Sequence, residues 1–153
     1  MNTVRKPTWL TYLGALPFLY ALAVAAYGFF DLNAVLGTEL RFARFKSYMV
    51  AHTYGAVIVA FLAGIQWGVS LNQPTDQQYF IISNVLALMA WFSLFAFASL
   101  MGMLLITVAF LLALWVDRHA HQQGMIPTWF WRLRLRITVL VVTTLVGLML
   151  LNQ

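Results

Sequence analysis

The sequence predicts an all-α integral membrane protein, a single bundle of five transmembrane helices, and three observations lead to this fold class. Of the 153 residues, 63% are hydrophobic and 8% are charged. Between Ser47 and Val116 a single charged side chain, Asp76, interrupts seventy residues. Because a helix needs roughly 20 apolar residues to cross a hydrocarbon core of about 30 Å, this stretch must cross the bilayer several times. No polar stretch is long enough for a soluble domain, so residues 1–153 are expected to form one membrane domain.

The first predicted span, residues 9–30, follows a short polar N-terminus directly. It is too long for a signal-peptide core and lacks a small-residue cleavage site, so we expect it to be retained. Pro17 removes one helical hydrogen bond and is expected to kink this helix. The other predicted spans are residues 47–71, 79–96, 99–116 and 135–151, of which the third and fourth divide an apolar run too long for one helix.

The distribution of Lys and Arg predicts the orientation. With five spans, one side of the membrane carries Arg5, Lys6, Arg118, Arg132, Arg134 and Arg136, and the other carries Arg41, Arg44 and Lys46. Positively charged loops favour the cytoplasmic side, which predicts an N-terminus inside and a C-terminus outside. The predicted location is the inner membrane of a bacterium, because an Arg-rich amphipathic organelle presequence is absent, and a processed organelle protein is the alternative.

Small residues recur every four positions in the second span, at Ala56, Ala60, Gly64 and Gly68. This ladder leaves one helix face almost bare, and such faces let helices approach closely in lipid. We expect packing within the bundle, with a homodimer seam or a ligand groove as the alternative. Gly64→Leu is therefore predicted to be disruptive, whereas Gly147→Leu in the fifth span serves as a control.

The same span contains the candidate ligand-binding residues. His52 is a lone imidazole within a predicted span, and it is either a structural hydrogen bonder or a ligand contact. Gln66 is a buried amide that either bonds a neighbouring helix or contacts a ligand. Tyr54 and Trp67 complete this candidate set.

The segment between the fourth and fifth spans interleaves tryptophan with arginine, a pattern typical of a membrane interface. The interfacial residues expected there are Trp129, Trp131, Arg132, Arg134 and Asp117. Asp117 is expected to pair with one of the arginines and so fix the fifth helix to the fourth. The basic segment from Leu40 to Lys46 is expected to form a second interfacial helix.

Several functions find no support in the sequence. The chain has no cysteine, which removes disulfides, thiol nucleophiles and the common zinc clusters. His119 and His121 form a two-ligand pattern, which is too weak to predict a metal site. No catalytic residues, metal or cofactor can be named, and the net charge of +5 indicates membrane-flanking residues rather than binding to nucleic acid.

Three segments together resemble a family of small membrane proteins of unknown function that includes the mitochondrial transmembrane protein 69. They are residues 14–18 (GALPF), residues 54–58 with 61–68 (YGAVI and FLAGIQWG), and residues 127–138 with Pro127, Trp129, Arg132, Leu133, Arg134 and Thr138. The resemblance implies a membrane protein and no particular activity.

The function expected from the sequence is a non-enzymatic accessory or assembly subunit that acts through helix packing, with the lipid bilayer and a membrane-protein partner or second copy around it. The alternative is a binder or carrier of a hydrophobic small molecule, such as a lipid, quinone or tetrapyrrole. The small-residue ladder favours the first function, and the 24 aromatic residues favour the second.

Overall fold

The computed structural model describes residues 5–29, 40–71, 77–97 and 99–151, and in these ranges every regular element is a helix. Within them, five helical segments are long and apolar enough to cross a membrane: Thr8–Tyr27, Phe45–Leu71, Gln78–Ala96, Leu100–Gln122 and Thr128–Leu151. The protein is a multi-pass membrane protein, and the predicted number of spans is confirmed. Phe30, the predicted end of the first span, lies outside the described residues.

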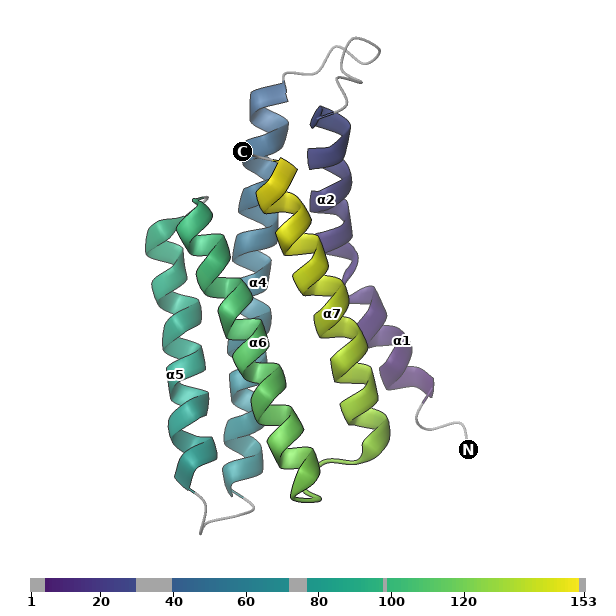
Figure 1. Cartoon of the computed structure of the whole chain (residues 1–153), viewed down its shortest axis with the longest axis vertical. Helices are drawn as coiled ribbons and strands as arrows, with labels where there is room; N and C mark the ends of the chain where they lie inside the picture. Colours follow the sequence, from purple (N-terminus) through teal and green to yellow (C-terminus); the bar gives the residue numbers. More distant parts are fainter. Residues whose placement is uncertain (1–4, 30–39, 72–76, 98, 152–153) are drawn as a thin grey trace.

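The described helices are α1 (Arg5–Leu13), α2 (Leu16–Phe29), α4 (Leu40–Leu71), α5 (Gln77–Ser93), the short 3-10 helix η1 (Leu94–Ala96), α6 (Leu100–Gln122) and α7 (Thr128–Leu151). The long helix α4 packs against α2, α5 and α6, and α7 packs against α2 and α6 (Figure 1). The α6–α7 turn lies at one end of the bundle, and the α5–α6 connection lies at the other end near the C-terminus (Figure 1).

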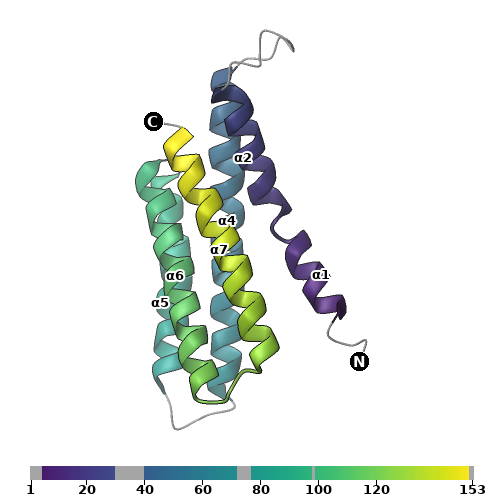
Figure 2. The ribbon, with the colours of Figure 1, turned by 45° about the vertical axis from the view of Figure 1, so that its right-hand side comes forward.

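The first span is broken at Gly14 and Ala15, between α1 and α2. Pro17 lies in the first turn of α2, where its missing N–H and fixed φ angle suit a helix start rather than a helix interior. The hydroxyl of Tyr54 donates a hydrogen bond to the Gly14 carbonyl oxygen at 2.9 Å, which satisfies an acceptor at the break. Beyond the break, α1 inclines away from the rest of the bundle (Figure 2).

Two boundaries differ from the sequence prediction. Residues 117–134 lie between the fourth and fifth predicted spans, but α6 continues to Gln122 and α7 begins at Thr128. The remaining turn closes through Gly124, whose φ of 76° suits glycine. The segment 40–46 is the first part of α4 rather than a separate interfacial helix, because neither proline nor glycine interrupts the chain between Leu40 and Tyr54.

The helices approach closely because alanine occupies the fully buried contact positions Ala21, Ala51, Ala109 and Ala113. Small residues let helix backbones pack together in lipid. Larger side chains such as Phe18, Leu86 and Met103 fill the remaining space in the core.

Candidate functional site

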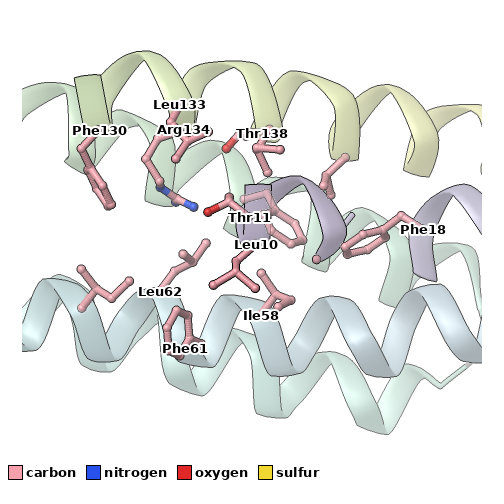
Figure 3. Close-up of a pocket in the computed structure, with 15 residues that line it drawn as sticks. Leu10, Thr11, Phe18, Ile58, Phe61, Leu62, Phe130, Leu133, Arg134 and Thr138 are labelled. Carbon is pink, nitrogen blue, oxygen red and sulfur yellow. The ribbon is translucent and has the colours of Figure 1, made fainter. Parts of the chain in front are cut away.

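An apolar pocket of about 340 Å³ lies between α1, α4 and α7 (Figure 3). Most of its wall is aliphatic or aromatic, and Arg134 is the one charged residue among the described residues that line it. The lining residues are Leu10, Thr11, Gly14, Phe18, Ile58, Phe61, Leu62, Ile65, Phe110, Phe130, Leu133, Arg134, Ile137, Thr138 and Val141.

The pocket opens sideways, toward the surface of the bundle that faces lipid. Leu10 of α1 and Phe61 of α4 line it, yet their side chains are 68% and 65% exposed. The exposed lining residues place the mouth between α1 and α4. It lies next to the break at Gly14 and Ala15, beyond which α1 inclines outward (Figure 2). A molecule dissolved in the bilayer could enter without crossing water.

Arg134 is held at the pocket by an ion pair inside the bundle. Its Nε atom donates to Oδ2 of Asp117 on α6 at 2.7 Å, and each side chain is 8% exposed. Gln66 of α4 donates from Nε2 to the Ala113 carbonyl oxygen at 3.2 Å and lies 3.5 Å from Asp117 Oδ1. Three helices thus meet around one carboxylate, and the pairing expected of Asp117 is present.

The ion pair lies close to one end of the bundle. Arg134 is six residues after the start of α7, or about 9 Å along the helix axis, and Asp117 is five residues before the end of α6, or about 7.5 Å. From Arg134 the pocket extends along α7 to Val141, roughly another 10 Å toward the bundle centre. The polar part of the pocket therefore lies near an interface, and the apolar part lies deeper.

Two hydrogen-bonding groups at the pocket have no partner among the residues that the structure describes. They are Nη2 of Arg134 and the hydroxyl of Thr138, one helical turn further along α7. In Figure 3 the guanidinium of Arg134 points across the pocket toward Thr11 of α1. Buried donors without acceptors are costly, and more so in lipid, where no water can replace the partner.

Thr138 differs from the other buried threonines. Thr107 donates to the Met103 carbonyl oxygen at 2.8 Å, and Thr144 donates to that of Leu140 at 2.9 Å. Such bonds to the preceding turn are the usual way to satisfy a threonine hydroxyl within a helix. Thr138 is 2% exposed and lines the pocket, and its hydroxyl makes no such bond, so it has no hydrogen-bond partner among the described residues.

His52 lies elsewhere, near the opposite end of the bundle. It is fully buried, its Nε2 atom is 3.2 Å from the Ser93 hydroxyl, and its ring stacks on Phe97 at 5.9 Å between centroids. A Cβ atom at Gly102 would overlap the imidazole and the Ala96 carbonyl oxygen. His52 therefore occupies a packed junction of α4, α5 and α6, away from the pocket.

The other candidate ligand residues have different surroundings. Tyr54 braces the break between α1 and α2, and its ring packs edge-on against Phe18 at 5.3 Å. Gln66 makes the contacts to α6 described above and does not line the pocket. Trp67 is 45% exposed and lies beside Phe80 of α5.

The small-residue ladder does not pack inside the bundle along its whole length. Ala56 is buried, whereas Ala60 and Gly64 are exposed. A Cβ atom built at Gly64 or Gly68 would meet no other atom within 4 Å. The prediction of packing within the bundle is therefore wrong for Gly64 and Gly68, because this part of the helix face points away from the neighbouring helices. Contact with another chain stays a prediction.

The residues expected at the interface fall into two groups. Trp129 and Arg132 are exposed, and Trp131 is half-buried and stacks on His121 at 6.0 Å. Asp117 and Arg134 are instead inside the bundle. The alternation of arginine with apolar residues concealed this difference, because α7 turns Arg134 inward and Arg132 and Arg136 outward.

Sequence reasoning missed Thr11 and Thr138 as pocket residues. The signal that could have found Thr138 is its position four residues after Arg134, which places both side chains on one face of a helix. Thr11 has no such signal, because its place at the pocket depends on the break at Gly14.

The comparisons with known proteins agree with the resemblance found in the sequence. The family described as "Protein of unknown function (DUF3429)" matches residues 3–150. A relative named "Transmembrane protein 69" from Xenopus tropicalis is 32% identical over 101 residues, which are 61% of this chain and 38% of the relative. The chain thus spans well under half of that relative's length. No solved structure matches this chain. The chain belongs to the DUF3429 family of membrane proteins, whose function is unknown.

Proposed function

We propose that this protein binds an amphipathic small molecule from the bilayer, with its polar head at Arg134 and its apolar tail deeper in the pocket. The observation that carries this proposal is the unpartnered Nη2 of Arg134 in a pocket that is otherwise almost wholly apolar. Small-molecule sites are typically apolar cavities of about 300–1,000 Å³ with a few polar groups that orient the ligand. The volume of about 340 Å³ falls in this range.

The composition of the pocket favours a lipid or quinone over a tetrapyrrole. Histidine, cysteine and methionine are the usual protein ligands of haem iron. None of these residue types is among the described residues that line the pocket, and His52 lies at the other end of the bundle. A single-headed amphiphile fits the arrangement better, since the polar groups gather at one end.

The proposal includes an orientation. Arg118, Arg132 and Arg136 are exposed near the polar end of the pocket. By the preference for positive loops inside, this end would face the cytoplasm of a bacterial cell, with the protein in the inner membrane. The ligand head would then lie at the level of the cytoplasmic headgroups.

The test is a search for bound small molecules in purified protein and in a variant whose pocket is filled. Ile58 lines the pocket and is half-buried, whereas the adjacent Val57 is 63% exposed. Wild type and Val57→Trp should retain the same amphiphile after gentle extraction, detected by mass spectrometry, and Ile58→Trp should lose it. Equal retention of every small molecule by all three proteins would overturn the proposal.

The expected role as an accessory or assembly subunit is a second candidate. It is favoured by one observation, the open surroundings of Gly64 on the outward face of α4. A bare helix face is suited to close contact with a helix of another protein or of a second copy. Affinity purification from crosslinked membranes, with Gly64→Leu as the comparison, tests this function independently of the pocket.

A further inference from the structure

We infer that the pocket selects a ligand whose head is an uncharged hydrogen-bond acceptor, namely the carbonyl group of a ketone, quinone or ester. This inference rests on the proposed binding function and specifies the ligand class. It follows from two features of Arg134: its charge is already compensated, and one of its N–H groups is still unused.

The charge of the site is balanced before any ligand enters. Arg134 contacts Asp117 at 2.7 Å, and both side chains are almost fully buried. A ligand anion would leave this buried group with one uncompensated negative charge. Uncompensated charge in an apolar interior is strongly unfavourable, whereas a neutral acceptor adds none.

The hydrogen-bonding groups, in contrast, are not balanced. Nη2 of Arg134 and the hydroxyl of Thr138 are both buried and unpartnered, and they lie four residues apart on one face of α7. A carbonyl oxygen has two lone pairs and can accept from both groups at once. One uncharged carbonyl oxygen therefore supplies the hydrogen-bond acceptor that both groups lack.

Asp117 is held away from the ligand. Its Oδ2 atom accepts from Arg134, its Oδ1 atom lies beside the Gln66 amide, and the residue is not part of the pocket wall. An entering head group thus meets donors on Arg134 and Thr138 without meeting the carboxylate.

The experiment compares three probes with the same alkyl chain in nanodiscs of uncharged lipid: a methyl ketone, a sulfonate and the plain alkane. The sulfonate remains ionised at every working pH, so protonation cannot disguise it. Binding is measured by native mass spectrometry and by competition. We expect the ketone to bind about tenfold more tightly than the sulfonate or the alkane.

Two variants examine the two halves of the inference. Thr138→Val should weaken ketone binding severalfold without changing alkane binding, and Thr144→Val is the matched control because that hydroxyl bonds its own helix. Asp117→Asn should reverse the preference toward the sulfonate, since it frees the positive charge of Arg134.

The outcomes separate the two proposals. If none of the probes binds wild type more tightly than Ile58→Trp, both the binding function and this inference fail. Sulfonate binding equal to or tighter than ketone binding in wild type would overturn the inference alone and leave the binding function standing. The wild-type comparison is decisive even if Asp117→Asn does not fold.

Discussion

Arg134 Nε and Asp117 Oδ2 are 2.7 Å apart and join α7 to α6 inside the bundle. This pair lets α7 carry Arg134 inside the bundle, ahead of the predicted start of the fifth span at Leu135. A charged residue that is paired across two helices can be accommodated within a span, so the arginine-rich segment need not remain at the surface.

The first prediction concerns the contribution of the Arg134–Asp117 ion pair to stability. Asp117→Leu should lower the free energy of unfolding by about 3–5 kcal/mol, because it leaves a buried guanidinium unpaired. The double variant Asp117→Leu/Arg134→Met should recover most of this loss, since well-packed apolar residues replace buried pairs at little cost. Thermal or denaturant unfolding in detergent measures both. Arg132→Met, at an exposed arginine, is the control, and an equal loss there would contradict the assignment.

Gly102 is predicted to be the least tolerant glycine of the described bundle. Gly102→Ala places a methyl group against the His52 ring and the Ala96 carbonyl oxygen, and overpacking of this kind costs about 1–3 kcal/mol. Gly64→Ala should be nearly neutral because open space surrounds that position. His52→Ala should relieve part of the Gly102→Ala effect, and a double-mutant cycle measures this coupling. Additive effects would show that the two residues do not conflict.

The outward face of α4 reverses the prediction made from the sequence for leucine substitutions. Gly64→Leu should leave the stability of the isolated chain within about 0.5 kcal/mol, as exposed substitutions usually do. Gly147→Leu should be the more disruptive change, because a Cβ atom at Gly147 already lies 3.1 Å from Leu22 Cδ1. Unfolding in detergent compares them. A greater loss for Gly64→Leu would mean that α4 packs differently within the chain.

Tyr54 is predicted to hold α1 in place at the pocket. Tyr54→Phe removes the hydrogen bond to the Gly14 carbonyl oxygen while retaining the ring contact with Phe18, and should cost about 0.5–1.5 kcal/mol. The chain has no cysteine, so spin labels on cysteines introduced into α1 and α7 report their separation cleanly. The distance distribution should broaden in Tyr54→Phe. Tyr20→Phe, at an exposed tyrosine of α2, should leave it unchanged.

Orientation is predicted from charge and can be measured directly. A phosphatase reporter fused after Gln153 should be active on the outer side, and a fluorescent protein fused there should remain dark. The opposite pattern would reverse the orientation and place the polar end of the pocket outside.

The sequence alone determined the membrane class and the number of spans. Each follows from long apolar runs and their interruption, which any fold in lipid must respect. The resemblance carried by residues 14–18, 54–68 and 127–138 likewise identified the family.

The tertiary structure decided which face of each helix is buried in the bundle and which face is exposed. Ala56 and Gly64 belong to one sequence pattern, yet one is buried and the other exposed, since neighbouring helices cover only part of a long helix. Arg132 and Arg134 look equivalent in the sequence, but they are two positions apart and so point about 200° apart around α7, which lets Asp117 reach Arg134 and not Arg132. The pocket depends on the break at Gly14 and on three helices meeting, and contacts between residues so distant in sequence leave no local pattern to read.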